Sequence, residues 1–181
     1  RELEALPVQG ARMVAGGVEF RAAAPGLAAV QVRIRTASRV LVRLASFRAK
    51  AFHELERAAR QVEWSRVLAP GTPFTLRVTC RKSRLYHSDA VAERVAAAIV
   101  RALPGSAWLA GAAPDDEQDD ETKPDAVATQ LFVVRFDRDE CTISADASGA
   151  LLHRRGYRLA VARAPMRENL AAALILSSGW D

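Results

Sequence analysis

The stretch from Phe74 to Leu103 constrains the fold of this chain more than any other part of the sequence. Its first half places an apolar residue at every second position, which is typical of a strand with one buried and one polar, basic face. The apolar set is Phe74, Leu76, Val78 and Cys80, and the polar set is Thr75, Arg77, Thr79 and Arg81. Residues 89–103 then repeat Val91, Val95, Ile99 and Ala102 at helical spacing. A strand that leads into an amphipathic helix favours a fold in which helices cover a sheet.

Other segments continue this mixture of strands and helices. Strands are predicted at residues 18–20, 38–46, 131–136 and 141–145, and the last two flank a turn and therefore predict a β-hairpin. Helices are predicted at residues 25–34, 49–62 and 165–178, with prolines in two first turns and Gly179 placed to end the last helix. The predicted fold class is α/β or α+β, with a mixed sheet flanked by helices.

Charge is distributed unevenly along the chain. Half of the 181 residues are apolar, enough for a core, and no apolar run is long enough to cross a membrane. The net charge is +5, but residues 114–125 hold seven carboxylates and one lysine. Removing them from the totals of 26 bases and 21 acids leaves 25 against 14, a balance of +11. A folded chain whose remaining residues carry so much positive charge favours a polyanionic partner.

The chain start and the cysteines indicate a cytoplasmic setting. The sequence shows no secretory signal and begins, without Met, on a charged segment, so we expect it to lie within a longer polypeptide. Cys80 and Cys141 fall in strand-like runs, where we expect two reduced thiols, with a disulfide as the alternative. Two cysteines and three scattered histidines do not predict a zinc site.

The first candidate site is the basic run between the strand and the helix. Free amides at a helix start attract phosphate, and neighbouring cations add salt-dependent affinity. Hydroxyl groups can donate to phosphate or sugar oxygens, and aromatic rings can stack on unpaired bases. The alternative is a solvated basic turn. The run consists of Arg81, Lys82, Ser83, Arg84, Leu85, Tyr86, His87 and Ser88.

A second basic cluster lies near the C-terminal end. It could provide another phosphate contact, or it could be a linker whose arginines pair with neighbouring acids. We expect the two clusters to converge on one phosphate-binding surface. Its members are His153, Arg154, Arg155, Tyr157 and Arg158.

The sequence predicts no catalytic residues. It contains no recognisable nucleophile arrangement and no glycine-rich phosphate loop of the Walker or dinucleotide type. His53, beside Phe52, is interpreted as a structural histidine. The acidic run lacks the spacing and turn glycine of a calcium loop. We therefore expect neither a metal nor a cofactor to bind within these residues.

Two runs, found in this order, resemble the THUMP domain of S-adenosylmethionine-dependent RNA guanine-N2 methyltransferases of the bacterial large-subunit rRNA type. The first joins Thr72-Pro73-Phe74 to residues 81–88 and Ala92-Glu93-Arg94-Val95, and the second joins Cys141-Thr142-Ile143-Ser144 to Ser148-Gly149 and residues 152–158. Residues 16–20 resemble the ferredoxin-like segment before THUMP, and residues 35–41 resemble the join between the two. Residues 164–181 resemble the first helix of the methyltransferase domain.

This resemblance implies a division of the chain and a role for it. Residues 1–47 would be a partial ferredoxin-like segment, residues 48–150 the THUMP domain with an acidic variable loop at 112–126, and residues 151–181 a linker and helix. The module would dock structured RNA, rRNA rather than tRNA, and position a guanosine for a methyltransferase domain in the same polypeptide. S-adenosylmethionine would bind that domain, after Asp181. Both basic clusters would contact RNA, with Arg77 and Arg94 on flanking elements.

Other functions stay open at this point. The same module accompanies tRNA guanine-N2 methyltransferases, thiouridine synthases, pseudouridine synthases and deaminases, although the predicted helix at 165–178 favours a methyltransferase. A self-contained small-molecule enzyme would need a convergent polar site, and a protein-interaction adaptor would need an exposed apolar groove.

Overall fold

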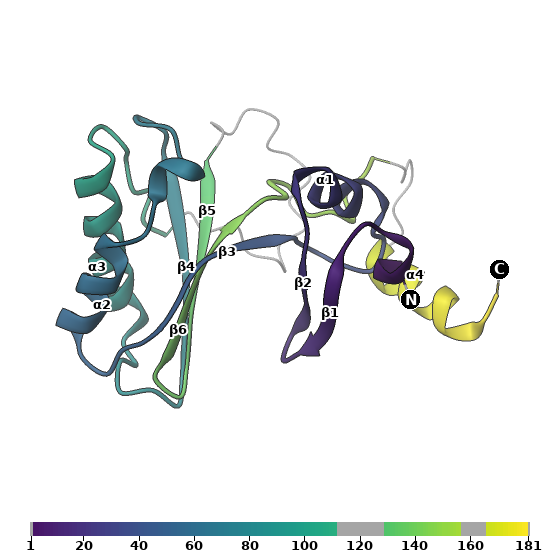
Figure 1. Cartoon of the computed structure of the whole chain (residues 1–181), viewed down its shortest axis with the longest axis horizontal. Helices are drawn as coiled ribbons and strands as arrows, with labels where there is room; N and C mark the ends of the chain where they lie inside the picture. Colours follow the sequence, from purple (N-terminus) through teal and green to yellow (C-terminus); the bar gives the residue numbers. More distant parts are fainter. Residues whose placement is uncertain (1, 112–128, 157–165, 181) are drawn as a thin grey trace. The chain divides into compact units, whose positions relative to one another are not determined.

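The computed structural model describes residues 2–111, 129–156 and 166–180. The chain forms two compact units (Figure 1). One unit combines Arg1–Val40 with Ala150–Asp181, and the other, which we call the sheet unit, is Leu41–Gly149. The sequence-based boundaries at residues 47 and 150 stay predictions. Strand β3 (Leu41–Arg48) belongs to the sheet unit because it pairs along its whole length with that unit's sheet.

The sheet unit contains a four-stranded mixed sheet, as the sequence predicted. Its strands are β3, β4 (Phe74–Arg81), β5 (Gln130–Asp137) and β6 (Glu140–Asp146), in the order β3-β6-β5-β4. The predicted hairpin is present as the antiparallel pair β5 and β6, and β3 also pairs with β6 in the antiparallel sense. Strands β4 and β5 run parallel, so both end at the same edge of the sheet.

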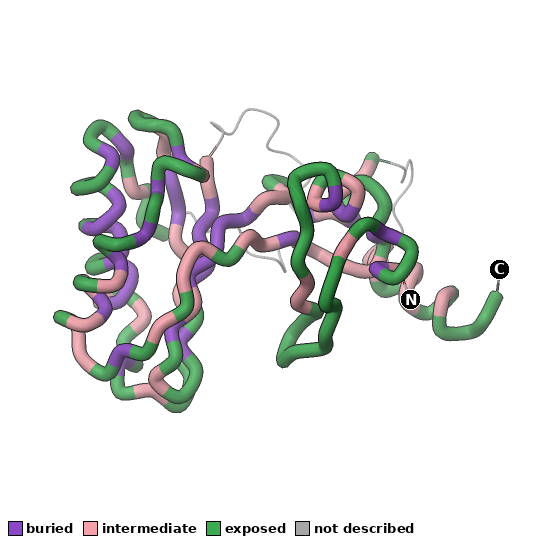
Figure 2. The backbone as a smooth tube through the Cα atoms, in the orientation of Figure 1, coloured by how far each residue is buried: buried purple, intermediate pink, exposed green. Residues whose placement is uncertain are grey.

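Helices α2 (Phe52–Arg60) and α3 (Ser88–Ala102) lie together on one face of this sheet, with the short 3-10 helix η2 (Trp64–Arg66) beside them (Figure 1). The predicted stripe of α3 is buried at Val91, Val95 and Ile99, whereas its fourth member, Ala102 at the end of the helix, is exposed. Burial is concentrated on the sheet and on the inner sides of these helices (Figure 2). One core therefore holds the sheet and helices together.

Phe132 of β5 lies at the centre of that core. It is fully buried and makes edge-to-face contacts with Trp64, at a centroid distance of 5.3 Å, and with Phe74, at 6.1 Å. The indole nitrogen of Trp64 donates a hydrogen bond to the carbonyl oxygen of Ala59 (3.0 Å), so the ring is buried with its polar atom satisfied. These aromatic contacts connect the sheet to the segment that follows α2.

The two cysteines are free thiols, as expected. Cys80 and Cys141 both pair with Phe136, one from each neighbouring strand, so a whole strand separates them. Two strand spacings amount to roughly 9–10 Å, beyond the Cα separation that a disulfide allows. Burial raises the pKa of the Cys141 thiol to about 12, with a further contribution from Cys80, so this thiol stays protonated and unreactive.

The other unit is smaller. It contains the 3-10 helix η1 (Glu2–Ala5), the hairpin of β1 (Gln9–Val14) and β2 (Gly17–Arg21), α1 (Ala24–Arg33) and α4 (Glu168–Ser178). Gly26 is required at its position because a Cβ there would lie 2.5 Å from the carbonyl oxygen of Pro7. Five residues form its buried apolar cluster: Leu3, Leu6, Val30, Ile34 and Val40.

Sequence patterns missed two elements. Strand β1 is exposed at every position and carries no alternation, so only its pairing with β2 defines it. The three-residue helix η2 is too short to show a helical period. Gly179 follows α4 in the left-handed conformation (φ 73°), as predicted for a residue that ends a helix.

Phe132→Ala should lower the free energy of unfolding by about 3–5 kcal/mol, because it removes an aromatic side chain from a fully buried position. Urea denaturation followed by far-UV circular dichroism measures the loss. Val100→Ala, at a 40 % exposed position of α3, is the control and should change stability by less than about 0.5 kcal/mol. Equal effects of the two substitutions would contradict this description of the core.

Candidate nucleic-acid interface

The basic run 81–88 forms a tight connection between β4 and α3. Strand β4 ends at Arg81, and the next residue, Lys82, has a left-handed backbone (φ 47°) that turns the chain. The Ser83 hydroxyl donates to the carbonyl oxygen of Arg81 (2.9 Å). Leu85 is buried and anchors the middle of the connection, whereas Arg84 and Tyr86 on either side are exposed. The connection is thus fixed at its centre and presents polar side chains to solvent.

The turn between β5 and β6 holds this connection in place. The amide of Arg138 donates to the carbonyl oxygen of Arg81 (3.1 Å). The amide of Asp139 donates to the Ser83 hydroxyl (3.0 Å), and the carboxylate of Asp139 accepts from the amide of Arg84 (2.8 Å). The carbonyl oxygen of Asp139 also accepts from the amide of Ala49, just after β3 (2.9 Å). Three chain segments are therefore joined through one turn.

Cations gather where these segments meet. We call the six basic residues of segments 48–50, 81–84 and 138 the basic edge. All six are exposed, and within the described part of the chain their side chains form no ion pair. The neighbouring acids are Glu54, whose carboxylate accepts from the amide of Lys50, and Asp137, Asp139 and Glu140. Six cations against four carboxylates leave a balance of +2. The basic edge consists of Arg48, Lys50, Arg81, Lys82, Arg84 and Arg138.

Half of the basic edge was missed by the sequence analysis. Arg48, Lys50 and Arg138 are isolated cations in the sequence. Strand pairing brings Arg138 beside Arg81, and it brings Arg48 and Lys50, at the end of the opposite outer strand, to the same edge of the sheet. The order of elements could have located them. A strand is followed by a helix twice, and two such units predict that the two strands run parallel and end at the same edge of the sheet.

Two aromatic rings stand beside the basic edge. Tyr86 is 68 % exposed, and its ring centroid lies 4.0 Å from that of His87 at an interplanar angle of 40°. His87 is the residue before α3, and no side chain caps that helix start. The positive end of the helix dipole and the amides of the first turn of α3 therefore lie at Ser88, the first residue of the helix. An exposed ring next to free amides and cations can accept a base and its phosphate together.

The start of α2 differs in this respect. The amide of Lys50 donates to the carboxylate of Glu54 (2.6 Å). This bond is the main cause of the lowered pKa of Glu54. An acidic side chain thus occupies an amide before the first turn of α2, as in a capping box. Helix α3 carries an acidic residue, Asp89, in its first turn.

The second predicted cluster has an internal role as far as the described residues reach. His153 is buried, and Arg155 is half-buried. The guanidinium of Arg155 donates to carbonyl oxygens of Gln31 (3.1 Å), Val32 and Ile34 (2.6 Å) at the C-terminal end of α1. It also donates to Leu152 (2.9 Å). Arg155 therefore satisfies carbonyl groups that the helix end leaves without partners.

The remaining members of that cluster are Arg154, Tyr157 and Arg158. Arg154 is exposed, and Tyr157 and Arg158 lie outside the described residues. The two predicted basic clusters belong to different compact units, so their convergence on one surface stays a prediction.

The two flanking arginines take different positions. Arg77 of β4 is half-buried, and one of its terminal guanidinium nitrogens is fully buried, so it is poorly placed to reach an external ligand. Arg94 of α3 is exposed; it pairs with Glu56 of α2 at 2.8 Å and lies 5.5 Å from the ring centroid of Phe52.

Across ranges 2–111, 129–156 and 166–180, no three His, Cys, Asp or Glu residues gather as metal ligands. None of the helices in these ranges is long and apolar enough to cross a bilayer. A mixed α/β unit with an exposed basic edge beside aromatic rings has the character of a nucleic-acid-binding module.

Comparison with known families agrees with this class. The family model described as the THUMP domain matches residues 49–146, which is more than half of the chain. The chain therefore belongs to the THUMP family, whose members are RNA-binding domains.

Whole-chain relatives are larger proteins. The chain is 32 % identical over 180 residues to "Ribosomal RNA large subunit methyltransferase K/L" of Methylococcus capsulatus, covering 99 % of this chain and 23 % of that protein. It is also 32 % identical, over 181 residues, to the protein of the same name from Syntrophotalea carbinolica, again covering 23 % of it. The chain thus spans about a quarter of the length of these relatives.

A solved structure shares the fold of the whole chain. It is described as the "crystal structure of a predicted N6-adenine-specific DNA methylase" from Listeria monocytogenes, with a TM-score of 0.77 and 28 % identity. The match covers 99 % of this chain and 44 % of that one. The fold of this chain is therefore found as one part of that larger protein.

Arg155→Gln should lower the free energy of unfolding by about 1.5–3 kcal/mol, since it removes a charged donor that serves four carbonyl oxygens. Urea denaturation followed by circular dichroism measures this. The matched control is Arg33→Gln, an exposed arginine of α1, which should stay within about 0.5 kcal/mol of the parent chain. A stability loss no larger than that of the control would contradict the internal role of Arg155.

Proposed function

We propose that this chain docks structured RNA on the basic edge and presents it to a methyltransferase domain in the same polypeptide. The observation that carries the proposal is a set of six exposed cations that form no ion pair with the described residues. They come from three chain segments that the Asp139 turn joins. Such a surface binds the phosphate backbone, which gives affinity and orientation and carries no base sequence information. The chain itself supplies no reacting group in this proposal.

The relatives support rRNA as the substrate class. Two relatives that match nearly the whole chain carry the name of large-subunit rRNA methyltransferases. We infer that the parent protein methylates a guanosine at N2 in the cytoplasm, with S-adenosylmethionine bound after Asp181. In this arrangement residues 48–150 are the docking module, residues 1–47 a partial ferredoxin-like segment, and residues 151–181 the linker and first helix of the methyltransferase domain.

Helix α4 fits that arrangement. None of its residues is buried, although Leu170, Leu174 and Ile175 are large and apolar. Trp180, just beyond the helix, is 73 % exposed. An apolar helix of this kind needs a cover, because exposed apolar patches mark contact surfaces. We assign the cover to the methyltransferase domain.

Binding at the basic edge can be tested by removing two of its cations. The double variant Arg81→Gln with Lys82→Asn should weaken binding to in vitro transcribed large-subunit rRNA by at least tenfold or so, because charge-assisted hydrogen bonds contribute about 1.5–3 kcal/mol each. The slope of log K against log salt should become shallower by about 1.4–1.8. Asn is chosen at position 82 because it tolerates the left-handed backbone there.

The control is Arg57→Gln with Arg66→Gln. This pair removes the same charge from exposed positions of the same unit that are not among the six residues of the basic edge. The proposal predicts a clearly smaller change in slope for the control. If RNA affinity and salt dependence are the same for both double variants, the basic edge is not the docking surface.

Stacking on Tyr86 makes a separate prediction. Tyr86→Leu should weaken binding of single-stranded RNA by about 1–3 kcal/mol, since it removes a π-face, and should leave duplex RNA binding nearly unchanged. Tyr86→Phe keeps the ring and should bind like the parent chain. Fluorescence anisotropy with matched single-stranded and duplex RNAs measures both. Equal losses on the two RNAs, or a loss in Tyr86→Phe, would exclude base stacking.

A further inference from the structure

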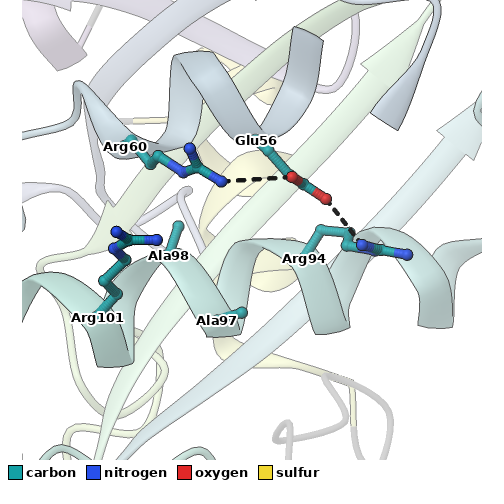
Figure 3. A pocket seen from close by; sticks show the side chains of 6 residues that line it. All are labelled: Glu56, Arg60, Arg94, Ala97, Ala98 and Arg101. Atoms are coloured by element: carbon teal, nitrogen blue, oxygen red, sulfur yellow. Dashed lines mark hydrogen bonds and ion pairs between the residues drawn. The ribbon is translucent and has the colours of Figure 1, made fainter. Parts of the chain in front are cut away.

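A second basic feature lies on the solvent side of α2 and α3. It is a groove of about 200 Å³ between the two helices (Figure 3). Ala97 and Ala98 form part of its lining. Because an alanine side chain is a single methyl group, space is left between the longer side chains around these two residues. Those longer side chains are Glu56, Arg60, Arg94 and Arg101.

The groove keeps a positive charge after its internal pairing is counted. One carboxylate oxygen of Glu56 pairs with Arg94 at 2.8 Å, and the other pairs with Arg60 at 3.5 Å. Three guanidinium groups against one carboxylate leave a balance of +2. Arg101 makes no ion pair or hydrogen bond through its side chain to the described residues. Figure 3 shows it beside Ala98, on the side of Arg60 that faces away from Glu56.

The size and chemistry of the groove suit one anionic group. Pockets for whole small molecules usually measure about 300–1,000 Å³, and this groove, at about 200 Å³, is smaller. A guanidinium group presents a planar fork of donors that matches the oxygens of a phosphate. Arg60 and Arg101 stand on two different helices around one hollow, so a phosphate between them could be bound from both sides.

The position of the groove relates it to the basic edge. Helices α2 and α3 begin directly after the segments that form that edge, at Phe52 and Ser88. Arg94 lies over the ring of Phe52 and pairs with Glu56, so it connects the start of α2 to the groove. From Phe52 to Arg60 the helix advances eight residues, or about 12 Å. A nucleic-acid strand bound at the edge could therefore continue along the two helices.

We propose that the groove between α2 and α3 is a second phosphate-binding site, in which Arg60 and Arg101 hold a backbone phosphate of the same RNA. This inference rests on the proposed function, because the phosphate belongs to the RNA that the basic edge docks. Glu56 fixes the guanidinium groups of Arg60 and Arg94 before RNA arrives. Arg101 supplies the charge that no carboxylate of the described residues neutralises.

The test is the double variant Arg60→Gln with Arg101→Gln, titrated with in vitro transcribed large-subunit rRNA at several salt concentrations. We expect at least about fivefold weaker binding and a slope shallower by about 0.7–1.8, equivalent to one or two lost phosphate contacts. The matched control, Arg57→Gln with Arg66→Gln, removes the same charge outside the groove. Circular dichroism melting establishes that both variants are folded.

A second measurement uses the unaltered chain. Bound rRNA should protect Arg60 and Arg101 from modification by phenylglyoxal more than it protects Arg57 and Arg66, as read by mass spectrometry. If the groove variant behaves like the control and its arginines are not protected, the second site is excluded. The docking proposal still stands in that case if the Arg81 and Lys82 variant loses affinity. If the unaltered chain does not bind rRNA at all, the proposed function itself fails.

Discussion

The parallel pairing of β4 with β5 sets the position of almost every residue considered for RNA binding in the sheet unit. Parallel strands end at one edge, so the end of β4 lies beside the turn that follows β5. The backbone bond from Arg138 to Arg81, together with the exchange between Ser83 and Asp139, can form only in this register. A slip of one residue would move Arg81 to the other face of the sheet and break these bonds. The cation cluster is thus a consequence of strand register.

The same topology determines where positive charge can serve a ligand. Helices that follow β3 and β4 begin at that edge, and their dipoles point their positive ends toward it. The partial positive charges of the helix starts and the full charges of the side chains therefore lie at one place. Counterions are released when a phosphate binds there. Arg155 shows the opposite use of a cation: its guanidinium fills the carbonyl groups at the end of α1 and is committed to the fold. The number of arginines alone does not distinguish a cation that binds a ligand from one that stabilises the fold.

Much of the fold could be predicted because its periodicities are local. The alternation in β4 and the apolar stripe of α3 are short-range patterns, and both elements are present at the predicted places. Strand β1 could not be predicted, because an exposed strand has no buried face to leave a pattern. For the site, the run 81–88 was visible as a cluster in sequence, whereas Arg48 and Arg138 reach the same edge of the sheet as Arg81 only through strand pairing. The internal role of Arg155 could not be read from its neighbours in sequence, since three of its four acceptors lie more than 120 residues away.

The most direct measurement for the central claim is amide chemical-shift mapping of the 181-residue chain during titration with a fragment of large-subunit rRNA. The account predicts that the largest shifts fall on segments 48–50, 81–88 and 138–140 together, with the exposed hairpin of β1 and β2 changing least. Large shifts confined to that hairpin, with segments 81–88 and 138–140 unmoved, would contradict a docking surface built on the β4–β5 edge.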